Sequence, residues 1–161
     1  ALRGIGLLVV TDLDPRALLC ARENIRHLGL ESQVDILEAD LFPEQRAALV
    51  VCNPPWLPAR PSSPIERGIY DPDSRMLTGF LNALPGHLAP GGEGWLILSD
   101  LAEHLGLRSR AELLQAFDQA QLRVLARHDV QPRHPKATDK ADPLHQARAA
   151  EVTSLWRLAA R

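Results

Sequence analysis

The sequence predicts an α/β fold: a mainly parallel sheet with helices on both faces and an antiparallel C-terminal hairpin. Short apolar runs that end in polar turns are typical of strands buried on both faces. These runs alternate with segments whose apolar residues recur at helical spacing, which indicates right-handed βαβ units. No helix is expected between the last two strands, at residues 122–130 and 152–158, which favours an antiparallel pair at the sheet edge.

The first expected strand covers residues 5–12, where a continuous apolar run ends at Asp12. Asp14 is expected to cap the following helix, because Pro15 comes next at the position where helices tolerate proline best. Gly29 is expected to end that helix. The N-terminal part of the chain therefore begins as strand, turn and helix.

Two more strands are expected at residues 34–37 and 48–52. The second of them ends abruptly at Asn53-Pro54-Pro55-Trp56, because prolines cannot continue the pairing of an inner strand. Residues 57–72 contain four further prolines, too many for a helix or a strand, so they are expected to form a loop that overhangs a site.

The second half of the chain shows the same alternation. Asp73 or Ser74 is expected to cap a helix that bends or ends at Pro85-Gly86. Residues 90–92 are expected to form a turn and residues 94–99 a buried strand. Ser109 and Glu112 have the spacing of a capping box and predict the start of another helix.

Length and composition limit the class of protein. A chain of 161 residues with 45% hydrophobic and 24% charged side chains is long enough for one domain with a core, and it is neither a disordered tail nor a membrane bundle. The formal charge of −2 leaves no general basic field that would attract nucleic acid.

Ligands of parallel α/β sheets bind outside the carboxyl ends of the strands. This rule selects four segments that follow expected strands: residues 11–14, 38–41, 53–56 and 99–100. We expect Asp12, Asp40 and Asn53 to lie at the same edge of one sheet.

Four segments, at residues 11–18, 38–42, 50–56 and 90–92, together resemble the Rossmann-like, S-adenosylmethionine-dependent methyltransferases with an Asn-Pro-Pro-aromatic motif. Within that family they are most similar to the group that includes the protein glutamine methyltransferases of release factors and ribosomal proteins. The resemblance implies a first strand, helix and glycine-rich cofactor loop that this chain lacks. Residues 1–161 are therefore expected to be the C-terminal part of a methyltransferase domain.

The resemblance makes the Asn53-Pro54-Pro55-Trp56 turn the catalytic segment. Methyl transfer depends mainly on alignment of the acceptor nitrogen, the methyl carbon and the sulfur. We expect the Asn53 side-chain oxygen and the Pro54 carbonyl to accept hydrogen bonds from the acceptor N–H groups. Pro54 and Pro55 would stiffen the turn, and Trp56 would offer a flat face to a planar amide or base. The alternative is a rigid turn that only ends a strand.

The resemblance also implies the cofactor contacts. Asp12, with Leu13, is expected to bind the ribose hydroxyls of S-adenosylmethionine, and Asp40, with Leu41, its adenine. Asn53 is expected to border the cofactor as well. The alternative for both aspartates is an ordinary turn carboxylate. Asp14 competes with Asp12 for the ribose, but it is better explained as the helix cap.

The function expected from these residues is N-methylation of a glutamine side-chain amide in a protein, with a translation-related protein as the partner. Two alternatives remain: methylation of an adenine or guanine amine in RNA or DNA, and a fragment or interaction module without catalysis. Tyr70, Asp71 and Arg75 lie in the segment that, by resemblance, covers the acceptor.

Other polar clusters favour no additional site. No metal is expected, because the spacing of His128, His134 and His145 fits no closed metal site. Basic side chains between the last two strands could touch an acidic partner, but solvated loop residues explain them better; they are Arg133, Lys136, Lys140 and Arg148.

The two cysteines, Cys20 and Cys52, lie in apolar surroundings without a CxxC pattern, which predicts reduced core thiols and a cytoplasmic protein. The apolar runs are far shorter than the ~20 residues that span a bilayer, so no membrane association is expected. Sheet edges left open by the missing strand are expected to allow self-association.

Overall fold

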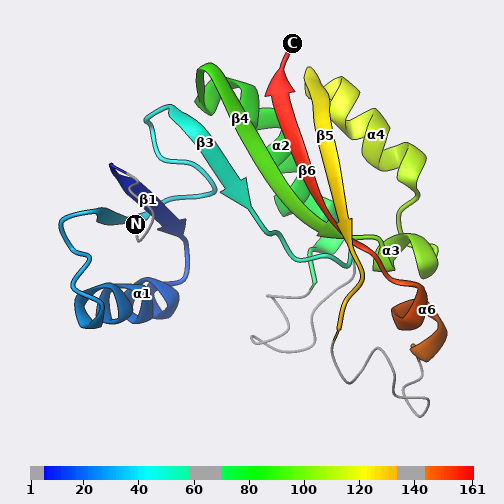
Figure 1. The fold of residues 1–161 in the computed structure, drawn as a ribbon, viewed down its shortest axis with the longest axis horizontal. Helices are drawn as coiled ribbons and strands as arrows, with labels where there is room; N and C mark the ends of the chain where they lie inside the picture. The colour runs from blue at the N-terminus through cyan, green and yellow to red at the C-terminus, as the bar shows by residue number, and fades with distance from the viewer. Residues whose placement is uncertain (1–5, 59–69, 134–143) are drawn as a thin grey trace. The chain divides into compact units, whose positions relative to one another are not determined.

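The computed structural model describes residues 6–58, 70–133 and 144–161 (Figure 1). The chain divides into two compact units, Ala1–Arg46 and Ala47–Arg161, here called the N-terminal and the C-terminal unit. Strands and helices alternate along most of both units, so the fold is α/β, as the sequence predicts.

The N-terminal unit is a strand–helix–strand element. Strand β1 (Leu8–Asp12) and strand β2 (Val34–Glu38) pair in parallel, and helix α1 (Pro15–His27) connects them. The Asp14 side chain accepts from the Arg16 backbone N–H at 2.9 Å, which confirms the predicted cap. Helix α1 ends two residues before Gly29, whose φ of 65° suits glycine.

The C-terminal unit contains a four-stranded sheet in the order β3-β4-β6-β5. Its strands are β3 (Ala47–Cys52), β4 (Leu88–Ser99), β5 (Leu122–Val130) and β6 (Thr153–Ala160). β3 and β4 are parallel, whereas β6 is antiparallel to both of its neighbours. In Figure 1, β6 (red) lies between β4 (green) and β5 (yellow).

Four helices and one 3-10 turn are described in this unit. They are η2 (Pro72–Ser74), α2 (Arg75–His87), α3 (Leu101–His104), α4 (Arg110–Gln119) and α6 (His145–Ala150). The Ser109 hydroxyl accepts from the Glu112 backbone N–H, and Glu112 accepts from the Ser109 N–H, so the predicted capping box opens α4.

The core of this unit lies between one face of the sheet and helices α2 and α4. Leu96 and Leu158 are fully buried on that face, and the rings of Phe117 from α4 and Trp156 from β6 meet edge to face at 5.3 Å. Gly94 lets α2 approach β4 closely, because a Cβ atom there would collide with the Leu84 side chain.

The structure differs from the sequence-based expectation in four local details. Residues 90–92 form no strand-ending turn: β4 pairs on both sides of them and bulges, with Gly91 at φ 74°. Helix α2 continues through Pro85 for two residues, because a proline in the last turn interrupts little of the helix. The last two strands do pair in antiparallel fashion, but helix α6, too short to give a periodic signal, lies between them in the chain where no helix was expected. Of the two, only β5 is an edge strand, since β6 also pairs with β4.

The described strands form two hydrogen-bonded sheets rather than one, and each belongs to its own unit. No ladder among the described residues joins β1 to β3. Both pairs of strands that the sequence placed in βαβ order, β1–β2 and β3–β4, are nevertheless parallel. Within each unit, the carboxyl ends of these paired strands therefore lie at one edge.

A charged pair crosses β4 and β6 on the partly buried face of the sheet that α2 and α4 leave open. Arg157 Nε donates to Glu93 Oε2 at 2.8 Å, and Trp95 Nε1 donates to the same oxygen at 2.8 Å. The hydrogen bonds from Arg157, and then that from Trp95, lower the pKa of Glu93 from 4.5 to about 2. The pair therefore prefers an ionised Glu93 in the folded state.

This preference predicts an acid dependence of stability. Because folding lowers the pKa of Glu93, the ionised side chain stabilises the folded state. This contribution to the free energy of unfolding is present above pH 4.5 and is lost as the pH falls toward about 2. We expect Glu93→Gln to lose less unfolding free energy than the wild type between these pH values. Urea unfolding followed at both pH values measures the difference, and parallel pH profiles of the two proteins would contradict the expectation.

Candidate functional site

Asp12 and Leu13 follow β1 at the carboxyl edge of the N-terminal unit. Asp12 Oδ1 accepts from the Asp14 backbone N–H at 2.7 Å, so it shapes the turn that leads into α1. Among the described residues, Oδ1 is the only oxygen of this exposed carboxylate that accepts a hydrogen bond. Oδ2 can therefore accept from a ligand hydroxyl. Leu13 is 55% exposed.

Asp40 and Leu41 follow β2 at the same edge. The Asp12 carbonyl accepts from the Ala39 N–H at 3.2 Å, and the Thr11 hydroxyl donates to the Leu41 carbonyl at 2.8 Å. Leu41 has φ 73°, a left-handed conformation that is unfavourable for a branched side chain. The structure thus brings together the four residues that the sequence assigns to ribose and adenine, in one unit.

The Asn53-Pro54-Pro55-Trp56 turn follows β3 in the C-terminal unit. Pro54 is buried, Pro55 and Trp56 are half-buried, and Asn53 is exposed. Trp56 Nε1 donates to Asn53 Oδ1 at 2.9 Å. The turn is therefore closed by a hydrogen bond between its first and last side chains, and one lone pair of the Asn53 oxygen remains for another donor.

Asp71 anchors the chain where it returns to this turn. Its backbone N–H donates to the Leu57 carbonyl at 2.8 Å, and Leu57 and Tyr70 form a parallel bridge. The buried Asp71 carboxylate accepts from the N–H groups of Met76 and Leu77 at 2.9 and 3.0 Å. Asp71 therefore joins the segment after Trp56 to the first turn of α2.

Of the two residues expected to cap this helix, Ser74 occupies the N-cap position, but the carboxylate that accepts from the first backbone N–H groups belongs to Asp71. Asp73 and Ser74 have φ values of 57° and 53°, and the Ser74 side chain makes no capping bond. The missed signal was Asp71-Pro72, the same pair that identified Asp14-Pro15 as a helix start. Here Pro72 begins the 3-10 turn Pro72–Ser74 rather than the helix itself, so the Asp71 carboxylate accepts from N–H groups one turn further along the chain.

Cys52 lies directly before Asn53, and its side chain is buried. Burial, and then the nearby charge of Asp71, raise the pKa of Cys52 to about 12. The thiol is protonated at neutral pH and is no nucleophile. Cys20, which the sequence also predicts in the core, is exposed: it lies about 200° around α1 from the buried Leu18.

Ser99 and Asp100 end β4 at the same edge as the Asn53 turn, because β3 and β4 are parallel. The buried Ser99 hydroxyl donates to the buried Glu151 carboxylate at 2.5 Å. Asp100 Oδ1 accepts from the Val152 N–H at 2.7 Å. These bonds tie the chain that enters β6 to the end of β4.

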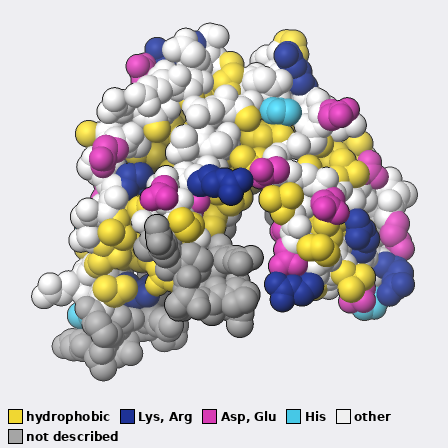
Figure 2. Space-filling view, turned by 180° about the vertical axis from the view of Figure 1, so that it is seen from behind, with side chains coloured by type: hydrophobic (Ala, Val, Ile, Leu, Met, Phe, Trp, Pro, Cys, Tyr) yellow, Lys and Arg dark blue, Asp and Glu magenta, His cyan; other side chains and the backbone are white. Residues whose placement is uncertain are grey.

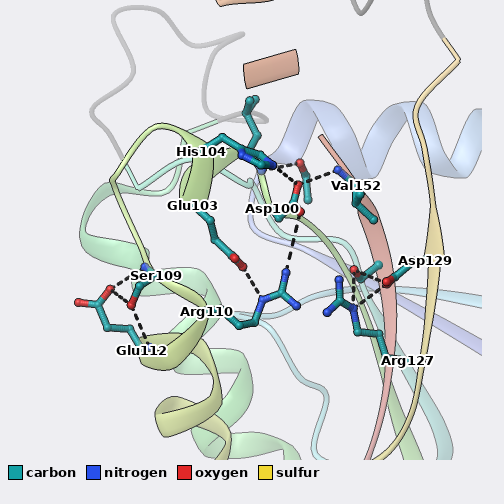
Figure 3. A network of polar contacts seen from close by, with 12 residues as sticks. Asp100, Glu103, His104, Ser109, Arg110, Glu112, Arg127, Asp129 and Val152 are labelled. Atoms are coloured by element: carbon teal, nitrogen blue, oxygen red, sulfur yellow. Dashed lines mark hydrogen bonds and ion pairs between the residues drawn. The ribbon is translucent and has the colours of Figure 1, made fainter. Parts of the chain in front are cut away.

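A polar network continues from Asp100 toward α4 and β5 (Figure 3). Arg110 Nε donates to Glu103 Oε1 at 2.7 Å, and its Nη2 lies 3.9 Å from Asp100 Oδ2. Arg110 and Arg127 both stack on the Trp156 ring, at 5.4 and 4.9 Å from its centre. These arginines are bound within the unit, so the network holds this edge in place.

Parts of three predictions, on the proline-rich loop, the histidine spacing and the basic side chains before the last strand, lie outside the described ranges. The residues concerned are 59–69, His134, Lys136 and Lys140. Within the described ranges no group of three or more His, Cys, Asp or Glu side chains could hold a metal ion. The same part of the chain contains no helix long and apolar enough to cross a membrane.

Three curated bacterial proteins are similar to this chain in sequence. A release factor glutamine methyltransferase of Cereibacter sphaeroides is 29% identical over 130 residues, covering 73% of this chain and 45% of the relative. A release factor glutamine methyltransferase of Moorella thermoacetica is 32% identical over 91 residues, covering 53% of this chain and 32% of the relative. A ribosomal protein L11 methyltransferase of Vibrio cholerae is 30% identical over 102 residues, covering 62% and 35%. The chain thus spans less than half the length of these relatives. No protein-family model matches it.

Solved structures agree on the fold. A geranyl diphosphate methyltransferase in complex with GPP and sinefungin aligns with 95% of this chain and 63% of its own, at a TM-score of 0.63 and 14% identity. The [4+2]-cyclase SpnF aligns with 96% of this chain and 66% of its own, at a TM-score of 0.58 and 15% identity. The chain therefore has the Rossmann-like fold that methyltransferases and this cyclase share.

The role of Asp71 can be measured through stability. In Asp71→Asn one carboxylate oxygen becomes an NH₂ group that faces a backbone N–H, so a buried donor loses its acceptor. We expect a loss of about 1–3 kcal/mol in the free energy of unfolding. Asp73→Asn, a matched change at an exposed residue, should alter it by less than about 0.5 kcal/mol. Equal effects in chemical denaturation would show that Asp71 is not the anchor.

The two thiols should differ in reactivity. We expect a thiol reagent such as DTNB to modify Cys20 rapidly in the folded protein at neutral pH, and to modify Cys52 only after unfolding in guanidinium chloride. Cys20→Ser should then show almost no reaction before unfolding. Rapid labelling of folded Cys20→Ser would contradict the burial of Cys52.

Proposed function

We propose that this chain is the C-terminal part of an S-adenosylmethionine-dependent N-methyltransferase domain that acts in the cytoplasm on a glutamine amide of a protein. The observation that supports this most strongly is the Asn53-Pro54-Pro55-Trp56 turn at the carboxyl end of β3. The turn presents an exposed carboxamide oxygen beside a rigid backbone. Sequence similarity to three protein methyltransferases supports the same reaction.

In this proposal the turn binds the acceptor nitrogen. The lone pair of Asn53 Oδ1 that Trp56 leaves available accepts one N–H, and the Pro54 carbonyl accepts the other. Both acceptors also favour the positive charge that develops on nitrogen during transfer. The half-buried Trp56 ring offers a face on which a planar amide can stack.

The N-terminal unit would hold the cofactor, which supplies an activated methyl group when bound. Its donor set fits a nucleoside: Asp12 Oδ2 can accept from ribose hydroxyls, and Asp40 lies at the same edge for an adenine amine. The exposed Leu13 and the half-buried Leu41 add apolar surface next to these carboxylates in the chain. Asn53 is proposed as a further contact of the cofactor.

A protein substrate agrees better with the chain than a nucleic acid does. The named targets of the similar proteins are a release factor and ribosomal protein L11. Among the described residues of each unit on the face shown in Figure 2, Lys and Arg side chains are interspersed with Asp and Glu and form no basic stripe of the kind that follows a phosphate backbone. Methylation of a base amine uses the same acceptor geometry and is the alternative outcome of the test.

Two substitutions separate the proposed roles. In the full-length enzyme, Asn53→Ala should lower kcat by two or more orders of magnitude and leave the Kd of S-adenosylmethionine nearly unchanged, because Asn53 acts on the acceptor. Asp12→Ala should mainly raise that Kd, since Asp12 is assigned to the ribose. Radiolabelled methyl transfer and titration calorimetry measure the two quantities.

The substrate is tested in the same assay with a glutamine-containing release factor fragment, and with a structured RNA as the comparison. Transfer to the glutamine amide supports the proposal, whereas transfer to RNA alone establishes the alternative. An Asn53→Ala enzyme with unchanged turnover would show that the turn only ends a strand.

A further inference from the structure

The Trp56 side chain has a polar contact that stacking does not explain. Its indole N–H donates to Asn53 Oδ1 at 2.9 Å, from a half-buried ring to an exposed carboxamide. The two prolines between these residues restrict the backbone, so the two side chains stay within reach of each other. The bond therefore belongs to the turn itself.

This bond determines which way the Asn53 amide faces. An asparagine side chain offers an oxygen acceptor and an NH₂ donor of nearly the same shape, and an exposed amide can rotate between the two orientations. An indole N–H can only donate, so the atom facing it must be the oxygen. The Nδ2 group then points away from the indole nitrogen, and one lone pair of Oδ1 stays available.

We propose that Trp56 is a positioning residue: its indole N–H holds the Asn53 carboxamide in the one orientation that can accept a hydrogen bond from a substrate N–H. The inference rests on the proposed function of Asn53. A phenylalanine at this position would keep an aromatic face but could not orient the amide. The ring and the N–H of Trp56 thus have separable roles.

The hydrogen bond can be observed without any enzyme assay. In the ¹H–¹⁵N spectrum of the protein, Trp56→Phe identifies the Trp56 indole signal as the one that disappears. Asn53→Ala should move that signal upfield and speed its hydrogen exchange, because the indole N–H loses its acceptor. The Trp95 indole, which donates to Glu93 Oε2 at 2.8 Å, serves as the internal reference and should stay unchanged.

Turnover then tests the positioning role. In the full-length enzyme, Trp56→Phe should lower kcat about fivefold, the rate equivalent of one neutral hydrogen bond, with the Kd of S-adenosylmethionine unchanged. In single-turnover measurements on the Asn53→Ala background, Trp56→Phe should cause no further loss, because the residue acts through Asn53. Trp95→Phe is the matched control, and its turnover should equal that of the wild type.

The outcomes separate this inference from the proposed function. A Trp56 indole signal that Asn53→Ala leaves in place, or a Trp56→Phe enzyme with full turnover, overturns the positioning role even if Asn53→Ala is inactive. A further loss for Trp56→Phe in the Asn53→Ala background assigns the effect to ring packing and also overturns it. By contrast, full turnover of Asn53→Ala, with the indole signal shifted, overturns the proposed function of Asn53 together with the positioning role that rests on it, and leaves only the hydrogen bond.

Discussion

Parallel pairing of β3 with β4 is the constraint on which the candidate site depends. Because both strands run in the same direction, the Asn53 turn and the Ser99–Asp100 segment must emerge at one edge. β6 then pairs with β4 in the opposite direction, which brings Glu151 and Val152 to that edge as well. In the N-terminal unit, the parallel β1–β2 pair imposes the same arrangement on Asp12 and Asp40.

Most of the polar side chains near the Asn53 turn hydrogen-bond the backbone and are not available to react with a substrate. Asp71 uses both carboxylate oxygens on backbone N–H groups of α2, and Cys52 stays a neutral thiol. Ser99 and Asp100 bind the chain that leads into β6. This division agrees with the proposed methyl transfer, in which the cofactor would supply the reactive group and the protein the alignment.

Asn53 illustrates how a motif acquires a geometry. The order Asn-Pro-Pro-Trp can be read from the chain, and so can its position after an apolar strand. The hydrogen bond from the Trp56 N–H to Asn53 Oδ1 cannot be predicted from the sequence, because it depends on how the turn brings the Trp56 side chain back to Asn53. That bond decides which lone pair of Asn53 Oδ1 remains for the proposed substrate N–H. The fold alone does not decide this, because a methyltransferase and a cyclase share it.

The sequence by itself determined the elements whose signals are local: the β1 and β3 strands, the Asp14 and Ser109 caps, and the positions of Asp12 and Asn53 after strands. Short helices such as α3 and α6 have too few residues for a periodic signal. Only the tertiary structure decided that β6 lies between β4 and β5, that β4 bulges at Gly91, and that Asp71 anchors α2. Each of these depends on contacts between residues distant in sequence or on the conformation of an intervening turn, which local propensity does not encode.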